Sequence, residues 1–382
     1  MEQERAVNIS DYPIPGAAAC GQRHLRVLAY GAAGARPKAY LQASLHADEI
    51  PGMLVSNHLC QLLNAAGPAI TGEIILLPVA NPLGLSQMVS GHLAGRYALS
   101  GAGNYNRQFP QLTAAAAARL GNQLGADAAA NVDLIRAALQ AVLDEQIPLE
   151  ETDWLRHRLL SLALDADIVL DLHCDLEALL HVYLGTPGWP GAADLSAQLG
   201  SRATLLATES GGYPFDEAVA GPWWALAGQF PQYPIHPACL AATIELRGNR
   251  DVDDKQARRD AENIFKFLQR RGVIEGDPGP LPKPLCEATT LEAVDVIRAQ
   301  TGGVVTMLAP LGSEVRPGDC VARIVDPMAA EEPQKRLDIR ARSQGLLFAH
   351  TDSRFVRPGQ ALCKVAGAEP LADRKPGHLL SD

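Results

Sequence analysis

The 382-residue sequence lacks the features that mark membrane, secreted and disulfide-stabilised proteins. No stretch approaches eighteen consecutive apolar residues, so no membrane-spanning helix is predicted. The N-terminal residues MEQERAVNISDYPIPG have no basic start followed by an apolar run, so no signal peptide is predicted. The seven cysteines include no C-x-x-C pair, and we interpret them as reduced thiols of a cytoplasmic protein.

Basic residues are in deficit as well. The 33 Lys and Arg residues face 43 Asp and Glu residues, which gives a net charge of -10. This balance argues against nucleic acid or an anionic membrane as a partner, because both favour a basic face. The remaining composition, with 47% hydrophobic and 20% charged residues, is typical of a globular protein. The length predicts two domains, one of them large.

Short apolar segments alternate with helical ones over residues 1–275, which we assign to the first domain. Strands are expected at 24–31, 39–46, 73–80, 167–173, 179–185, 203–208 and 241–246. Helices are expected at 51–66 and 253–272, and two or three more within 111–164. Apolar strands that alternate with helices predict an α/β domain with a mostly parallel sheet covered on both faces.

The composition of the sequence changes at a proline-rich stretch, 276–288, which we interpret as a linker. Beyond it the sequence VRPGD at 315–319 recurs as VRPGQ at 356–360, each copy followed by an apolar segment. Two similar hairpin-like halves predict a small all-β barrel or sandwich over 289–368, and they resemble the halves of a biotinyl/lipoyl-type barrel. The remaining residues, 369–382, are expected to form a flexible tail.

Two histidines are expected at the ends of strands. His46 ends one predicted strand, and Glu49 follows it just before a helix. A lone His-x-x-Glu is more often a polar loop than half of a metal site, but His173 also ends a predicted strand. Two histidines and a carboxylate at strand ends form the ligand set of a hydrolytic zinc site. Asp171 shares the face of His173, and either holds its second ring nitrogen or contacts a neighbouring loop.

Glu245 lies within the hydrophobic segment AATIELRG. A carboxylate on a buried strand is costly unless it is paired or functional. Its side chain is therefore either the base that activates water in a hydrolase, or one half of a structural salt bridge with Arg247 or Arg250.

The glycine-rich stretch RYALSGAGNYNRQFP, 96–110, carries Arg96, Asn106 and Arg107. Arginine suits the bidentate recognition of carboxylates and the stabilisation of an oxyanion. The alternative is a loop pinned by surface salt bridges.

The order of these motifs resembles the succinylglutamate desuccinylase/aspartoacylase family, relatives of the zinc carboxypeptidases. The motifs are His-x-x-Glu, Arg-Tyr, Asn-Arg-x-Phe, Asp-Leu-His and a strand glutamate, and the resemblance covers residues 20–265. It implies a carboxypeptidase-like mixed, mostly parallel sheet flanked by helices, and the C-terminal barrel also resembles the β domain of that family. The segment ALSGAG between Arg96 and Asn106 is interpreted as an insertion relative to the family.

The resemblance also implies roles for individual residues. One Zn²⁺ per subunit would be held by His46, Glu49 and His173. Glu245 would be the general base, and Arg96 would polarise the scissile carbonyl. Asn106 and Arg107 would hold a substrate carboxylate, and further substrate contacts are sought among Tyr183, Tyr213 and Arg247.

The predicted function is zinc-dependent hydrolysis of an amide, removing the acyl group from an N-acyl amino acid or a related small carboxylate. The alternative on the same scaffold is a zinc carboxypeptidase that acts on short peptides. A carrier role for the barrel is disfavoured, because Lys335 lacks the Met-Lys-Met setting of biotinyl domains. The expected partner is a small-molecule substrate, with no nucleic acid and no membrane, and assembly into a homo-oligomer stays open.

Overall fold

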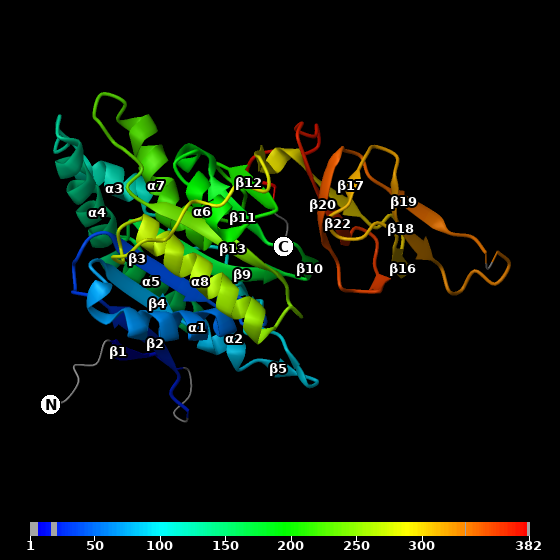
Figure 1. Ribbon diagram of the computed structural model, residues 1–382, viewed down its shortest axis with the longest axis horizontal. Helices are drawn as coiled ribbons and strands as arrows, with labels where there is room; N and C mark the ends of the chain where they lie inside the picture. Colours follow the sequence, from blue (N-terminus) through cyan, green and yellow to red (C-terminus); the bar gives the residue numbers. More distant parts are fainter. Residues whose placement is uncertain (1–6, 17–20, 333, 380–382) are drawn as a thin grey trace.

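The structure is a computed structural model that describes residues 7–16, 21–332 and 334–379. Within those residues the larger domain is built on a nine-stranded sheet with the order β1-β2-β4-β3-β9-β13-β11-β12-β14 (Figure 1). Its strands are β1 (Asn8–Pro13), β2 (His24–Tyr30), β3 (Lys38–Ala43), β4 (Glu73–Leu77), β9 (Ile168–Asp175), β11 (His181–Gly185), β12 (Ala203–Ala207), β13 (Leu240–Gly248) and β14 (Ala288–Thr290). The pairs β3–β4, β3–β9, β9–β13, β11–β12 and β12–β14 are parallel, whereas β1–β2, β2–β4 and β11–β13 are antiparallel. The predicted mixed, mostly parallel sheet is therefore confirmed.

Helices cover both faces of this sheet, which explains why its central strands are apolar on both sides. The first face packs against α1 (Pro51–Ala66), α6 (Ala193–Leu199) and α8 (Asp254–Arg270). The second face packs against α3 (Thr113–Leu120), α4 (Ala128–Asp144), α5 (Glu151–Ala163) and α7 (Phe215–Gln229). None of the described helices is long and apolar enough to cross a membrane.

The helices begin and end where local chemistry predicts. Helix α1 has the expected bounds and carries Pro51 in its first turn, where a missing N–H costs nothing. Helix α8 begins after Asp253, whose carboxylate accepts a hydrogen bond from Gln256 N. The alanine- and leucine-rich region 111–164 forms three helices.

The stretch 81–104 holds only short elements, and it runs along the edge of the sheet where the parallel strands end. These are α2 (Pro82–Leu85), β5 (Met88–Val89), β6 (His92–Leu93), β7 (Tyr97–Ala98) and β8 (Gly103–Asn104). The strands pair as two small hairpins, β5–β6 and β7–β8. The sequence analysis did not predict these hairpins. Single helical turns also occur at Gly67–Ala69, Thr186–Gly188 and Leu291–Ala293.

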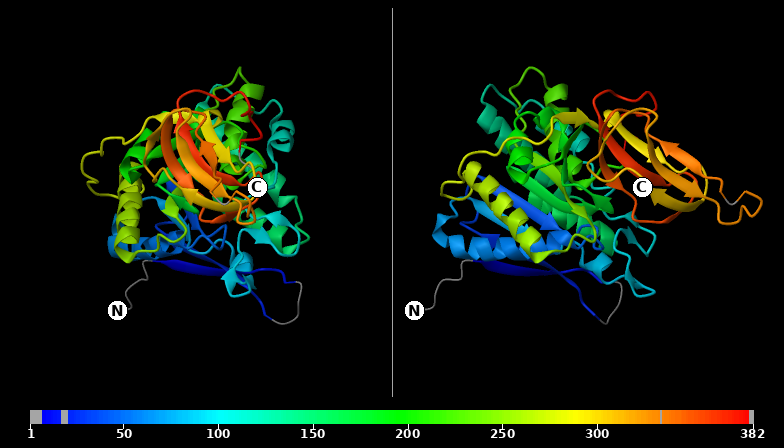
Figure 2. Two further views of the ribbon diagram at one scale, coloured as in Figure 1. Left: turned by 90° about the vertical axis from the view of Figure 1, so that its right-hand side faces the viewer. Right: turned by 45° about the vertical axis from the view of Figure 1, so that its right-hand side comes forward.

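The C-terminal region is all β, and it projects from one end of the larger domain (orange in Figures 1 and 2). Its strands are β15 (Val294–Arg298), β16 (Gly303–Met307), β17 (Glu314–Val315), β18 (Cys320–Val325), β19 (Leu337–Arg340), β20 (Gly345–His350), β21 (Phe355–Val356) and β22 (Ala361–Gly367). They form two sheets around an apolar core of their own. Both copies of the repeated VRPG sequence form the turn that leads into a long strand, β18 in one half and β22 in the other.

The two regions are joined by strand pairing as well as by apolar contact. Strand β10 (Glu177–Ala178) of the larger domain pairs with β20 of the C-terminal region. Strand β14, at the end of the proline-rich stretch, pairs with β12 of the larger sheet. An apolar cluster that includes Leu205, Val294 and Phe348 fills the space between them. We propose that 276–288 separate the two domains. Residues 276–287, all of them described, contain neither helix nor strand.

Residues 369–379, which lie in the predicted flexible tail, make contacts with both the C-terminal region and the larger domain. Leu371 N donates to Glu292 O, and Leu379 N donates to Ser210 O. Leu379 is only 2% exposed. This part of the chain is therefore held by specific contacts with residues far away in the sequence.

Candidate active site

A cavity of about 500 Å³ opens at the carboxyl ends of the parallel strands, between the larger domain and the C-terminal region. It is lined by all seven residues that the sequence analysis singled out as candidate site residues: His46, Glu49, Arg96, Asn106, Arg107, His173 and Glu245. Strands β3, β9 and β13 are parallel neighbours, so their carboxyl ends meet at one edge of the sheet and bring distant residues together.

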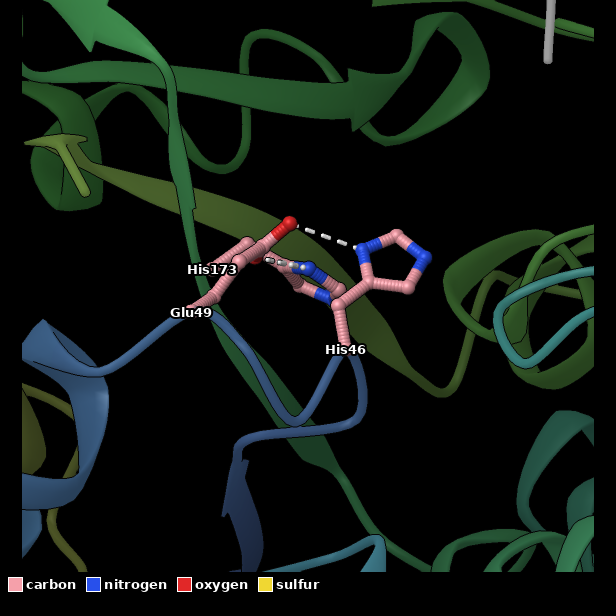
Figure 3. Close-up of side chains that lie close together, drawn as sticks. All are labelled: His46, Glu49 and His173. Atoms are coloured by element: carbon pink, nitrogen blue, oxygen red, sulfur yellow. Dashed lines mark hydrogen bonds and ion pairs between the residues drawn. The ribbon is translucent and has the colours of Figure 1, made fainter. Parts of the chain in front are cut away.

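Glu49 stands between the two histidines (Figure 3). Its Oε1 lies 2.8 Å from His46 Nδ1, and its Oε2 lies 2.8 Å from His173 Nδ1. One ligand atom from each residue lies within 4.8 Å of the others, close enough to hold a metal ion. The chain leaves β3 through Ser44, whose φ of 64° is a strained value for a residue with a side chain. That turn directs His46 and Glu49 back toward the end of β9.

The outer nitrogens of both histidines also meet oxygen atoms. His46 Nε2 lies 2.8 Å from Asn104 Oδ1, and His173 Nε2 lies 3.0 Å from Asp171 Oδ2. Such partners fix the orientation of a ligand imidazole and point its other nitrogen toward the metal. Asp171 thus contacts the histidine and not a neighbouring loop. Asn104 was missed by the sequence analysis, and its only signal is its place two residues before Asn106.

Burial and charge act against each other in the cluster. Burial lowers the pKa of His46. Burial also acts against protonation of His173, but Asp171 and Glu49 hold its pKa well above the ordinary value. For Glu49 burial acts against ionisation, but the two histidines hold its pKa well below the ordinary value. An ionised carboxylate between two imidazoles is a donor set that a divalent cation takes over when the histidines lose their protons.

Glu245 projects from β13 directly beside this cluster. Its register partners are His173 on β9 and His181 on β11. Burial, and then the negative charge of Glu49, raise the pKa of Glu245 to about 8. Its Oε2 has no hydrogen-bond partner among the described residues.

The alternative of a structural salt bridge for Glu245 is not supported by the position of Arg247. The guanidinium of Arg247 binds Asp260 instead, with Nη2 and Oδ2 2.5 Å apart. Arg247 is absent from the lining of the cavity, where the sequence analysis had considered it a substrate contact.

Arg96 reaches the cluster from the hairpin region. Its Nη1 lies 2.9 Å from Glu49 Oε1 and 3.2 Å from His46 Nδ1. The backbone of this region is tied to the ligand turn, because Ala47 N donates to the carbonyl oxygen of Gly95. Arg96 thus places a cation at the mouth of the cluster, where its side chain is 42% exposed.

Asn106 and Arg107 are buried on the cavity wall, with exposed fractions of 6% and 8%. Asn106 Oδ1 accepts a hydrogen bond of 2.9 Å from Phe215 N at the start of α7. Arg107 Nη1 donates to the carbonyl oxygen of Asn106 at 2.7 Å. Buried hydrogen bonds therefore help to hold this part of the loop.

The C-terminal region supplies part of the cavity wall. Arg298, Thr351, Gln360 and Lys364 line the cavity from that side. Lys364 Nζ lies 2.5 Å from Asp175 Oδ2, at the end of β9. Of the tyrosines considered earlier, Tyr183 lines this cavity, whereas Tyr213 lines a second, smaller one.

Two histidines and a carboxylate near strand ends, with a second buried carboxylate and arginines in one cavity, are the side chains that metal-dependent hydrolases use. Residues 35–136 match the family model of the succinylglutamate desuccinylase/aspartoacylase catalytic domain. The predicted resemblance to this family of deacylases is confirmed.

Solved structures agree with this result. A succinylglutamate desuccinylase/aspartoacylase family protein from Shewanella amazonensis is 27% identical, with a TM-score of 0.81 over 94% of this chain and 98% of that chain. A second such protein, from Shewanella frigidimarina, is 24% identical, with a TM-score of 0.81 over 95% and 98% of the two chains. The ectoine utilization protein EutE from Ruegeria pomeroyi is 18% identical, with a TM-score of 0.67 over 96% and 97%. The last two show the fold alone. No curated protein matches this chain in the comparison made.

Proposed function

We propose that this protein is a zinc-dependent amidohydrolase that removes the acyl group from an N-acyl amino acid or a related small carboxylate. The observation that carries the proposal is the arrangement of one cavity. A His-Glu-His cluster, the buried carboxylate of Glu245 and the polar side chains of Asn106 and Arg107 all face the same space.

The three ligands suit zinc. Imidazole nitrogens and a carboxylate oxygen are its usual donors in hydrolytic sites, which keep one position open for water. His46, Glu49 and His173 would hold the ion, with Asn104 and Asp171 behind the two imidazoles. When bound, zinc supplies a Lewis acid and a water whose pKa is lowered toward neutrality.

Glu245 is the proposed general base. Its carboxylate stands beside His173 in the sheet register and has an oxygen without a partner among the described residues. It would take a proton from the attacking water and then deliver that proton to the leaving amine nitrogen. Burial among apolar strands raises the pKa of this carboxyl, so its ionised form is a stronger base for the first of these steps.

The arginines and the asparagine orient the substrate. Arg96, next to Glu49, would stabilise the negative charge that develops on the carbonyl oxygen. Arg107 and Asn106 would bind a free carboxylate of the substrate at the cavity wall, since a guanidinium offers two parallel N–H groups. That requirement makes an amino acid with an acylated nitrogen the natural substrate class.

Metal analysis combined with a substrate panel tests the proposal. Purified protein should contain about one zinc per chain and hydrolyse N-acetyl or N-succinyl amino acids. Faster cleavage of short peptides at their C-terminal residue would instead favour the carboxypeptidase alternative. Absence of any stoichiometric divalent metal would reject both. We place the enzyme in the cytoplasm, in keeping with the six described cysteines, which are all free.

A further inference from the structure

The last described stretch of the chain, 371–379, returns from the C-terminal region and lies against the loop that precedes α7. We call it the C-terminal segment. Gly377 N donates to Glu209 O at 2.9 Å, and Leu379 N donates to Ser210 O at 2.8 Å. Arg374 secures the end of the segment, because its Nη2 donates to the carbonyl oxygen of Leu379 at 2.6 Å. The side chain of Leu379 is buried and forms part of the cavity wall.

Two glycines separate this segment from Arg107. Gly211 has a φ of 120°, and a Cβ atom there would lie 2.5 Å from the carbonyl oxygen of Gly377. Gly212 has a φ of 73°, and a Cβ atom there would collide with Cδ of Arg107. The C-terminal segment, the Gly211–Gly212 backbone and the arginine side chain therefore form three layers in direct contact, with no room for a side chain between them.

Hydrogen bonds join the chain around the Gly211–Gly212 layer to the chain around Asn106 and Arg107. Gln108 N donates to Gly212 O at 2.8 Å, and Phe215 N donates to Asn106 Oδ1 at 2.9 Å. Residues 208–214, between β12 and α7, contain no helix or strand and include two glycines. Such a loop has high conformational entropy, so contacts from outside are needed to hold it in one conformation.

We propose that the C-terminal segment positions Arg107 and Asn106 through the Gly211–Gly212 layer, and thereby sets the affinity for the substrate carboxylate. This inference rests on the proposed function, in which these two side chains bind that carboxylate. Arg374 and Gly211 are positioning residues, because neither lines the cavity and both act through other groups.

Two variants test the coupling from different sides. Gly211→Ala forces a methyl group against Gly377 O, and Arg374→Ala removes the hydrogen bond that holds Leu379. Each should raise KM for an N-acyl amino acid about tenfold and leave kcat within about twofold, as expected for lost uniform binding. Zinc content should not change, since the metal ligands lie on other elements.

Controls come from one turn of the C-terminal region. Gly318 also has a positive φ, 93°, but a Cβ atom there meets nothing within 4 Å, and Arg316 is exposed in the same turn. Gly318→Ala and Arg316→Ala should leave both KM and kcat unchanged. A proportional fall of kcat in the two test variants, or an unchanged KM, would overturn the inference.

Hydrogen–deuterium exchange separates this inference from the proposed function. The amides of Gln108 and Phe109, bonded to Gly212 O and Tyr213 O, should exchange faster in Gly211→Ala and Arg374→Ala than in the wild type or the controls. Unchanged exchange in peptides that cover 106–112 would reject the coupling. If the wild type cleaved no N-acyl amino acid, the proposed function would fail, and the exchange result would still decide whether the segment holds the loop.

Discussion

The cluster of His46, Glu49 and His173 and the loop 96–110 face the same cavity but are held in different ways. His173 and Glu245 stand on adjacent parallel strands as direct register partners, and His46 and Glu49 lie in the short turn that follows the neighbouring strand β3. The loop at 96–110 has only two-residue strands, and its conformation depends on hydrogen bonds from the segment before α7, about a hundred residues later. A residue on a strand is hard to displace, because the hydrogen bonds between neighbouring strands fix its position at many points. Changes around the cluster should therefore affect chemistry, and changes around the loop should affect binding.

The largest effect is expected at Glu245. Glu245→Gln keeps the shape of the side chain but removes the proton acceptor, so kcat should fall by about three orders of magnitude. Zinc content should stay at the wild-type level, because Glu245 is not a proposed ligand. Paired measurement of kcat and bound metal checks this, with His173→Ala as the variant that loses both. Near-normal turnover of Glu245→Gln would refute the role of this residue.

Asn104 is expected to connect the cluster with the loop 96–110. Its Oδ1 contacts His46 Nε2 and also accepts a hydrogen bond from Asn106 N at 2.8 Å. Asn104→Ala should weaken zinc binding by about 10–100-fold, the usual cost of losing the partner of a ligand histidine. It should also raise KM, because the loop loses an internal bond.

Asp171→Asn is the matched control for this experiment, since Asp171 contacts His173 and not the loop. Competition with a chelator should show weakened metal binding in both variants. An elevated KM at saturating zinc should appear only in Asn104→Ala. The same KM change in both variants would contradict the view that the cluster governs chemistry and the loop governs binding.

Arg107→Lys tests the loop alone. A lysine keeps the charge but cannot make two parallel hydrogen bonds to a carboxylate, so KM should rise by about tenfold or more with little change in kcat. The steady-state constants measure this directly. The rise in KM should be at least as large as in the Arg374→Ala variant, which disturbs the Arg107 side chain only indirectly, through the Gly211–Gly212 backbone.

The last expected effect is on the stability of the metal-free protein and not on its activity. Burial raises the pKa of Glu245 from 4.5 to about 8, so the folded protein holds a proton there that the unfolded chain releases. The contribution of this group to stability therefore falls as the pH rises from about 5 to 8. At pH 8 Glu245→Gln should be more stable than the wild type, by about 2–4 kcal/mol. Denaturant melts of the metal-free proteins at pH 5 and pH 8 check this, and a gap that did not narrow at pH 5 would contradict it.

Local patterns predicted the elements that place the cluster. The helix 51–66 has the expected bounds, and the parallel strands β3, β9 and β13 were each expected from short apolar runs. Since parallel strands meet at one edge of a sheet, a histidine or carboxylate at each strand end was enough to predict that His46, His173 and Glu245 come together. These three residues line one cavity for this reason.

Contacts that depend on chain segments without such periodicity were not predicted. The hairpins β5–β6 and β7–β8 are too short to leave a pattern, and the role of Asn104 follows only from their geometry. The ion pair between Lys364 and Asp175 joins residues 189 positions apart, one from each region. The docking of 371–379 likewise depends on backbone atoms of a glycine loop.

The sequence by itself determined the alternation of strands and helices, the candidate ligand set and the resemblance to a family, because these depend on local periodicity and on residue types at strand ends. Only the tertiary structure decided what surrounds that set: which groups orient the histidines, which region closes the cavity and what holds Arg107. Those features are contacts between distant segments, and their formation depends on complementary shape and on the pairing of backbone hydrogen bonds. Neither property is written in the order of residues along any one segment.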